Sequence, residues 1–466
     1  MSATPGRVLI IGAGPAGLFA ASELACQGLG RRVVIVERGR EMPERSCPQS
    51  PACDCGVCDM LCGVGGAGGF SDGKNTISLT RGTQGEELFD ADAYPIMRHV
   101  DEEVARLAGT EGVVLDPVHG EASEWFSRDG FRFSSYPLRH VGSDGIRRSI
   151  IAMREELGAA GVRFLTGVRA TVVSTRGERV SGAYVKDARG VLGWVGANHV
   201  MLATGLDGQP WAEAALRRLG ATFLPGPAGI GIRLETPAEV LAPLFETFYD
   251  WKMERGRLRS FCCNHHGSIV NENHQSMGIR NVNGHSYLDP AQRTGSSNCA
   301  IMAKLPAAAM TETDTQDLVK SIARAINTAA EGHTVVQRAV DFVAGVETDP
   351  AYDRVANPYR TNHQSVSGVD IGGFLAEAGG LDREFQDYLV GLDRIVPGVL
   401  GEDSLVYAPE VKYYSRRVAI DRNWRCMGVP GLHVIGNASG YLDSFVAAAT
   451  SGIIAARDIA QRCSKW

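Results

Sequence analysis

The distribution of apolar residues predicts a strand, a tight turn and a helix early in the chain. Residues 8–11 form an apolar run that breaks into a Gly-x-Gly-x-x-Gly pattern at residues 12–17, and small and apolar residues follow at helical spacing. A second apolar run, residues 32–37, ends in an acid about twenty positions after the glycines. This order is typical of a dinucleotide-binding βαβ unit.

Each glycine of this turn has a physical reason to be there. Gly12 allows the tight turn, Gly14 lets the backbone approach a pyrophosphate, and Gly17 lets the helix pack closely against the strand. The helix N-terminus offers free N–H groups to the phosphates, and Glu37 is placed to accept hydrogen bonds from an adenosine ribose. We therefore expect a cofactor to contact Gly12, Gly14, Pro15, Ala16, Gly17, Glu37 and Arg38.

Further periodic patterns predict the elements that follow. Amphipathic patterns indicate helices at residues 94–108 and 146–157, and a final helix over about residues 443–463. Residues 41–70 are rich in Cys, Pro and Gly and are expected to be mostly loop. Residues 206–410 form a long mixed region. Short apolar runs predict strands at residues 162–165, 168–174, 180–186, 191–196, 199–205 and 432–436.

The strand at residues 432–436 ends in Gly436-Asn437 and leads into a small-residue helix. This arrangement resembles the second flavin motif of glutathione-reductase-type flavoproteins. The resemblance implies that Asn437, where such proteins usually carry Asp, bonds the ribityl chain, and that the helix N-terminus faces the flavin ring. Together with the ends of the strands at residues 168 and 199–205, this places at the cofactor Val168, Thr204, Gly205, Gly436, Asn437, Phe445 and Val446.

A second glycine-rich loop spans residues 63–74. Consecutive glycines allow positive φ and a close backbone approach to a bulky ligand. In a flavoprotein this loop would lie against the pyrophosphate and the flavin ring, whereas a flexible surface loop is the alternative. Lys74 would stabilise a reduced flavin or hold an acidic substrate. The contacts expected from this loop are Gly65, Gly66, Ser71, Asp72 and Lys74.

The nucleotide-binding signals lie at both ends of a chain of 466 residues, which is long enough for two packed domains. We predict an α/β fold, in which a glutathione-reductase-type, Rossmann-like FAD-binding domain carries an inserted mixed α+β substrate domain. The FAD-binding domain is expected over residues 1–90, 145–210 and 410–466. The substrate domain is expected over residues 91–144 and 211–409.

Residues 65–74, Gly-Gly-Ala-Gly-Gly-Phe-Ser-Asp-Gly-Lys, are similar to the signature of an uncharacterised family of FAD-dependent dehydrogenases related to geranylgeranyl reductases. Residues 136–144 and 406–412 resemble further blocks of that family, and the resemblance runs from residue 7 to about residue 460. It implies the FAD fold and leaves the activity open. Residues 259–267 depart from the family's Cys-x-Cys-Pro-Gly-Gly type of sequence, which indicates an unusual substrate.

Composition and charge narrow the classes of partner. The net charge of −6 offers no general basic surface, so we do not expect nucleic acid as a partner. No signal pattern precedes the first strand, and the apolar stretch at residues 445–456 is too short to span a bilayer. We therefore expect a cytoplasmic protein without an integral membrane segment. The oligomeric state is open.

Five of the eleven cysteines fall within sixteen residues, directly before the second glycine-rich loop. Such clustering indicates a local metal or redox function rather than a secretory disulfide framework. An iron–sulfur cluster that passes electrons to the flavin, a structural zinc, a redox disulfide and a set of inert thiols are the alternatives. The candidate metal ligands are Cys47, Cys53, Cys55, Cys58 and Cys62.

Two adjacent histidines complete the candidate chemistry. His265 and His266 follow a predicted strand and are candidate catalytic residues beside Lys74, as general acids or as contacts to a substrate carboxylate. Histidines that are exposed to solvent or cap the core are the alternative interpretation.

Together these patterns predict an FAD-dependent dehydrogenase or reductase that transfers a hydride between flavin N5 and a small organic substrate. No second Gly-x-Gly-x-x-Gly follows a strand in residues 100–430. NAD(P)H would therefore act only as a transient donor in the substrate cleft, or a protein donor would supply the electrons. A flavin monooxygenase and a non-catalytic FAD and cysteine redox sensor are the alternative functions.

Overall fold

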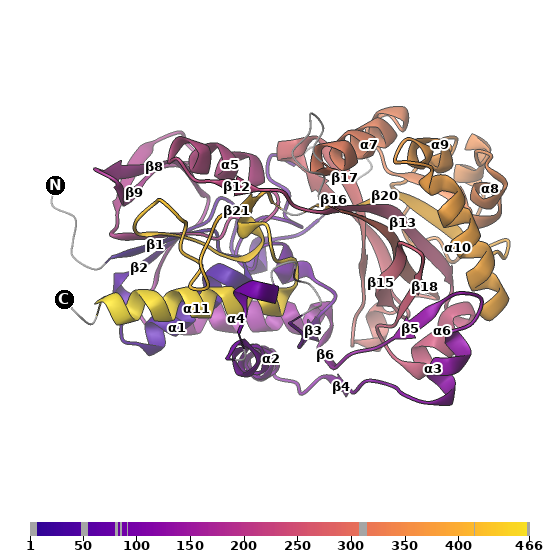
Figure 1. Ribbon diagram of the computed structural model, residues 1–466, viewed down its shortest axis with the longest axis horizontal. Coiled ribbons are helices and arrows are strands. Elements are labelled where there is room, and N and C mark those ends of the chain that lie inside the picture. Colours follow the sequence, from indigo (N-terminus) through magenta and orange to yellow (C-terminus); the bar gives the residue numbers. More distant parts are fainter. Residues whose placement is uncertain are drawn as a thin grey trace.

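The computed structural model describes residues 7–463, apart from residues 48–54, 80–82, 84–85, 91, 307–314 and 414. Two large sheets lie side by side along the long axis of the molecule, and each is covered by its own set of helices (Figure 1).

The first sheet is parallel, with the strand order β22-β11-β1-β2-β7. Alternate residues of its central strand, β1, pack into two different hydrophobic cores on opposite faces of the sheet. Val8 and Ile10 pack against helices, whereas Leu9 and Ile11 pack against a three-stranded meander and α5. The strands are β1 (Val8–Ile11), β2 (Val33–Val36), β7 (Arg163–Leu165), β11 (His199–Leu202) and β22 (Leu432–Val434).

The helices on one face of this sheet come from distant parts of the chain. They are α1 (Pro15–Cys26), α2 (Ala93–Ala108), α4 (Gly142–Ala159) and α11 (Phe445–Cys463). Helix α11 lies directly against α1, and a Cβ on Gly452 would stand only 2.1 Å from the carbonyl oxygen of Ala16. The other face carries β8 (Val168–Arg176), β9 (Arg179–Asp187), β10 (Leu192–Gly196) and α5 (Gln209–Arg218).

The second sheet is antiparallel, with the strand order β19-β20-β13-β18-β15-β14-β5. One face of this sheet carries buried side chains such as Ile230, Ile232 and Ile301, which form a hydrophobic core with the helices. The opposite face is directed toward the parallel sheet. The strands are β5 (Arg132–Ser134), β13 (Ala228–Pro237), β14 (Lys252–Arg255), β15 (Leu258–Asn264), β18 (Ser296–Leu305), β19 (Val335–Arg338) and β20 (Leu405–Tyr413).

Helices cover the outer face of this sheet, and short sheets connect the two halves. The helices are α3 (Glu121–Phe126), α6 (Ala238–Thr247), α7 (Thr315–Ala329), α8 (Ala339–Ala344), α9 (Ile371–Ala376) and α10 (Leu381–Ile395). The short sheets contain β3 (Lys74–Thr76), β4 (Val113–Leu115) and β6 (Leu138–His140), the hairpin β16 (Ser268–His274) and β17 (Ile279–His285), and the pair β12 (Phe223–Leu224) and β21 (Arg417–Val418).

The predicted fold class is confirmed: a Rossmann-like parallel sheet, built from both ends of the chain, carries an inserted mixed region. The described residues of the expected loop over 41–70, which leave out 48–54, contain only short 3-10 segments, at Met42–Glu44 and Ala67–Phe70. The strands of the large antiparallel sheet, which lie within residues 206–410 apart from β5 and the end of β20, were not predicted from the sequence. Within the described ranges, no helix is long and apolar enough to cross a membrane.

Candidate active site

A cavity of about 1260 Å³ runs from the glycine turn after β1 to the inner face of the antiparallel sheet. Pockets for drug-sized ligands occupy about 300 to 1,000 Å³, so this cavity has room for a larger ligand and a second molecule. The predicted cofactor-binding residues that line it are Gly12, Gly14, Pro15, Ala16, Glu37, Arg38, Gly66, Ser71, Asp72, Lys74, Val168, Thr204, Gly205, Gly436, Asn437 and Phe445, and Cys62 of the candidate metal ligands lines it as well. Gly17, Gly65 and Val446 do not line it.

The N-terminus of α1 is open toward this cavity. Gly14 holds the N-cap position, Pro15 begins the helix, no side chain caps it, and its first turn carries no acidic residue. A Cβ on Gly14 would have only the Cα of Gly66 within 4 Å, at 3.9 Å, whereas a Cβ on Gly12 would stand 2.2 Å from the carbonyl oxygen of Ala203. Gly12 therefore serves the turn, and Gly14 leaves uncapped N–H groups that suit a phosphate.

Polar groups along the same wall also fit a bound dinucleotide. The hydroxyl oxygen of Thr204 is buried and has no hydrogen-bond partner within the described part of the chain. Such an orphaned group calls for a ligand or water partner. Beside it, Gly205 adopts φ +62°, with open space where a Cβ would stand. The side-chain oxygen of Asn437 accepts a hydrogen bond from Ser415 at 3.1 Å, which orients its amide at the cavity wall.

Glu37 has a structural role that the sequence did not reveal. Its carboxylate accepts hydrogen bonds from the backbone N–H groups of Ala13 at 2.9 Å, Gly39 at 2.9 Å and Gly63 at 3.0 Å. The acid thus ties the first glycine turn to the second glycine-rich loop. Its predicted contact with a ribose stays a prediction, because both carboxylate oxygens already accept hydrogen bonds. Arg38 forms an ion pair with Asp207.

The second glycine-rich loop is held from behind by Arg45. The guanidinium is buried and donates to the carbonyl oxygens of Asp59 at 2.7 and 2.9 Å, Val64 at 2.7 Å and Gly66 at 2.8 Å. Burial lowers the pKa of Arg45 to about 10. Nothing in the local sequence distinguishes this arginine from a surface one, so sequence reasoning missed it.

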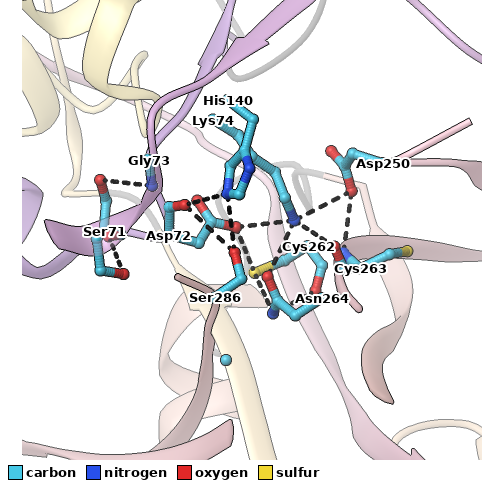
Figure 2. A network of polar contacts seen from close by, with 12 residues as sticks. Ser71, Asp72, Gly73, Lys74, His140, Asp250, Cys262, Cys263, Asn264 and Ser286 are labelled. Atoms are coloured by element: carbon cyan, nitrogen blue, oxygen red, sulfur yellow. Dashed lines mark hydrogen bonds and ion pairs between the residues drawn. The ribbon is translucent and has the colours of Figure 1, made fainter. Parts of the chain in front are cut away.

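Lys74 lies at the centre of a buried polar network (Figure 2). Its ammonium group contacts Asp72 at 3.0 Å, Asn264 at 3.0 Å and Asp250 at 3.7 Å, and it donates to the carbonyl oxygen of Cys263. An ammonium group has three donors, and Asp72, Asn264 and Cys263 accept them. Lys74 therefore acts as a fixed positive charge that orients its neighbours.

The charges in this network hold one another in place. Burial opposes the charged form of Lys74, but Asp250 and Asp72 outweigh it and raise its pKa above the ordinary value. Burial would raise the pKa of Asp250, but Lys252 and Lys74 hold that pKa below its usual range. His140, stacked on Tyr249 at 4.4 Å, is different: burial and then the charge of Lys74 lower its pKa to about 4, so it is neutral.

Cys262 is a second cavity residue that the sequence did not single out. The register of β15 shifts between Phe261 and Asn264, and Cys262 has φ +49° within this bulge. As a result, two consecutive residues, Phe261 and Cys262, both line the cavity, although a regular strand would place them on opposite faces. The sulfur lies 3.4 Å from Asp72, and burial raises the pKa of the thiol.

The structure places the two candidate histidines away from the cavity wall. His265 stacks on Phe245 at 4.7 Å, and its Nδ1 lies 2.9 Å from the hydroxyl of Ser297. The Nδ1 of His266 lies 2.9 Å from the carbonyl oxygen of Thr294. Neither side chain lines the cavity, so this geometry does not bring them to the other candidate residues.

The predicted metal site is not supported. Among the described residues, no three His, Cys, Asp or Glu side chains are placed to hold a metal ion, and no cysteine forms a disulfide. Cys58 is buried in an apolar cluster, and Cys62 accepts a hydrogen bond from Arg38 at 2.8 Å. Burial raises the pKa of the Cys58 thiol to about 11 and also raises that of Cys62. Cys53 lies outside the described residues, and Cys47 and Cys55 join no such group.

The parallel sheet, the open helix N-terminus and the long cavity define a flavoprotein of the FAD-dependent oxidoreductase class. The chain belongs to the family described as FAD binding domain, whose sequence model matches residues 7–248, more than half of the chain. It is an FAD-dependent oxidoreductase. No curated protein matches this chain.

Solved structures show distant likeness over almost the whole chain. A flavoprotein/dehydrogenase from Cytophaga hutchinsonii is 12% identical with a TM-score of 0.39, covering 98% of this chain and 79% of that one. A geranylgeranyl bacteriochlorophyll reductase-like protein from Thermoplasma acidophilum has the same four values. L-amino acid deaminase from Proteus vulgaris is 12% identical with a TM-score of 0.42, covering 99% of this chain and 95% of that one. Likenesses this distant carry no argument about the substrate.

Proposed function

We propose that this oxidoreductase transfers a hydride between FAD and a small organic substrate bound against the antiparallel sheet. The observation that carries the proposal is the continuity of the cavity, whose wall joins the glycine turn after β1 to residues of β13, β15 and β18. FAD supplies the redox chemistry when bound, because its ring accepts or delivers a hydride at N5.

The residues fall into two groups by the part of the ligand they would hold. The open N-terminus of α1, Thr204 and Gly205 suit the ADP half of FAD, while Gly66, Ser71, Asn437 and Phe445 suit the flavin half. We assign residues 1–90, 145–210 and 410–466 to the cofactor domain, and residues 91–144 and 211–409 to the substrate domain. The composition of the two large sheets supports this division in part. Helix α2 (Ala93–Ala108) packs with α1, α4 and α11 on the parallel sheet, and β20 (Leu405–Tyr413) of the antiparallel sheet crosses the boundary at residue 410.

Lys74 is a positioning residue in this proposal, because its three donors are occupied by protein acceptors. It supplies a fixed positive charge and orients Asp72 beside Cys262. We assign the exchangeable substrate proton to Cys262, whose thiol lines the cavity and keeps its proton at neutral pH because burial raises its pKa. Electrons would come from NAD(P)H visiting the cavity or from a protein donor.

The glycine-rich motif supports a finer placement. We infer that the chain is related to the FAD-dependent dehydrogenases that resemble geranylgeranyl reductases, because residues 65–74 carry the motif of that family. Seven members of the motif line the cavity: Gly66, Ala67, Gly68, Phe70, Ser71, Asp72 and Lys74.

The test is turnover by the purified, FAD-loaded protein under labelled oxygen. A metabolite mixture is offered with NADH or NADPH, and flavin bleaching and ¹⁸O content of the product are measured together. Flavin reduction or reoxidation linked to a product without label supports hydride transfer. Label in the product would show a monooxygenase instead, and a flavin that no donor–acceptor pair turns over would show a redox sensor. Replacing Cys262 by Ala should slow proton-coupled turnover about a hundredfold while flavin reduction by dithionite is unchanged.

A further inference from the structure

Met302 lies on β18, the middle strand of the antiparallel sheet, and its side chain lines the cavity. It pairs with Gly231 of β13 on one side and with Arg259 of β15 on the other, so the three residues form one row across the sheet. Ala300 precedes it by two positions, and alternate residues of a strand share a face. Met302 is therefore a long side chain beside two positions, 231 and 300, that carry little or no side chain.

The side chain of Met302 lies over the glycine of the next row. Gly229 also lines the cavity, and a Cβ built on it would stand 2.5 Å from the Sδ and 3.0 Å from the Cγ of Met302. The methionine thus occupies the space that a side chain at position 229 would need. The φ of Gly229 lies outside the left-handed region, so the backbone conformation does not require glycine there. The room taken by Met302 explains this glycine.

The floor of the cavity around Met302 is shallow only because of this one side chain. A Cβ on Gly231 would stand 2.0 Å from the carbonyl oxygen of Ile301, so this position stays without a side chain. Beyond its Cβ, methionine consists of an unbranched Cγ, Sδ and Cε, which are flexible and polarisable and adapt to an apolar neighbour. Shortening Met302 would open a trough over Gly229, and lengthening it would raise the floor.

Phe261 extends the apolar area on the β15 side. It lines the cavity and pairs with Ala300, which places it in the row next to Met302. Its ring centre lies 5.1 Å from the ammonium group of Lys412 and 6.0 Å from that of Lys252. Cations at this distance are attracted to an aromatic ring and help to fix its position. The floor therefore offers an adaptable thioether beside a ring that is held in place.

We propose that Met302 is a specificity-determining residue, whose side chain over Gly229 sets how large an apolar group of the substrate fits against the antiparallel sheet. The inference rests on the proposed function and deepens it by naming the residue that limits the substrate of that same cavity. The group over Met302 is apolar because the thioether accepts hydrogen bonds only weakly, and a polar group buried against it would lose its partners in water.

The test measures the length of a bound chain on the FAD-loaded protein. Primary alcohols from 1-butanol to 1-decanol are titrated, and binding is followed by flavin absorbance and calorimetry. Affinity should rise about fourfold per methylene up to a limiting length and then level off. Met302→Ala should move this limit outward by about three carbons and tighten binding of the longest alcohols at least about tenfold. Met302→Phe should move the limit inward.

Two control variants separate size from other effects. Met302→Leu nearly conserves the volume and should keep the limit within about one carbon. Met427→Ala shortens a methionine that is 55% exposed and does not line the cavity, and it should leave the limit unchanged.

A second pair of variants tests the contact with Gly229. Gly229→Ala places a methyl group against the Met302 thioether and should push it into the cavity, which shortens the limit; the next contact, the carbonyl oxygen of Ala303, is farther away at 3.3 Å. In the Met302→Ala protein the same change should have a much smaller effect, because Sδ and Cγ are gone.

Four results would overturn the inference: a limit that Met302→Ala does not move, a Met302→Leu protein that behaves like Met302→Ala, alcohols that bind to none of the proteins, or a folded Met302→Ala protein that loses its flavin. If Met302→Ala does not fold, the inward shifts expected of Met302→Phe and Gly229→Ala decide. Flavin content and dithionite reduction are measured in each sample. Their persistence beside an unchanged limit would show that the cofactor site and the proposed function stand although the role of Met302 does not.

Discussion

The two ends of the cavity differ in which groups line them: backbone groups at the cofactor end and side chains at the antiparallel sheet. The cofactor end consists largely of backbone: the open N-terminus of α1, the glycines at positions 14, 66 and 205, and loops tied together through Glu37. The end at the antiparallel sheet consists of long charged side chains on strands, such as Lys304 and Arg259. Backbone sites need glycine at fixed spacing, whereas side-chain sites need only a register between strands. One end can therefore be recognised in the sequence, and the other becomes visible only when the strands are paired.

The largest expected effect comes from filling the backbone end. Gly14→Leu places a side chain where only the Cα of Gly66 lies within 4 Å, so the chain should fold and the cofactor should be excluded. We expect flavin content to fall by at least about tenfold, measured as the absorbance ratio at 450 and 280 nm. Gly56→Leu, at a site with open space and outside the cavity, is the control and should keep its flavin. A yellow Gly14→Leu protein would contradict the proposed role of this turn.

The next effect concerns the buried charges between the two ends. Lys74→Met leaves Asp72 and Asp250 without their shared cation. Removing one partner from a buried ion pair costs about 3 to 5 kcal/mol, so the free energy of unfolding in urea should fall by that amount. Lys186→Met, on the surface hairpin β9–β10, should change it by less than about 0.5 kcal/mol. Equal stability of both variants would show that the network adds nothing to folding.

The two halves should also respond to pH in opposite directions. Burial lowers the pKa of His199 in the parallel sheet to about 4 and raises the pKa of Glu235 in the antiparallel sheet to about 7. The unfolded chain binds the proton of His199 between about pH 6.5 and 4 while the folded one does not, so acid lowers stability. Folded Glu235 keeps a proton that the unfolded chain releases above about pH 4.5, so its contribution falls as pH rises toward 7.

The variant Glu235→Gln separates the two contributions. Because its amide does not titrate, its stability relative to the unmodified protein should rise between pH 4.5 and 7, by on the order of 2 to 3 kcal/mol. Chemical denaturation at several pH values measures this difference. A difference that does not change with pH would mean that Glu235 titrates normally in the folded protein.

The smallest effect is expected from metal removal. Among the described residues, no group of three His, Cys, Asp or Glu side chains is placed to hold a metal ion. Dialysis against EDTA should therefore leave flavin content unchanged and shift Tm by less than about 1 °C. A larger loss, or stoichiometric iron or zinc in the purified protein, would restore the metal interpretation.

The sequence predicted most of what depends on local pattern. The helices α2 and α11, the meander of β8 to β10 and the fold class agree with the periodicity of the chain. The bulge at Cys262 could not be predicted, because it depends on how β15 pairs with β18. Arg45 was missed for a related reason, since its acceptors are backbone carbonyls that converge only after the loop folds. His265 and His266 were predicted to be catalytic from their residue type alone. In the structure their positions are set by the stacking of His265 on Phe245 and by the contact of His266 with the carbonyl oxygen of Thr294.

The contact between α1 and α11 has a consequence for how the protein is made. Pro15 and Phe445 both line the cofactor end of the cavity, although they are 430 residues apart. A ribosome adds about 5 to 20 residues per second, so the glycine turn emerges roughly 20 to 90 s before its last partner. During that time the sheet first lacks β11, which pairs with β1, and then lacks β22, which pairs with β11. Until then the parallel sheet has an open apolar edge, and the cofactor end of the cavity is completed only after Phe445 has been synthesised.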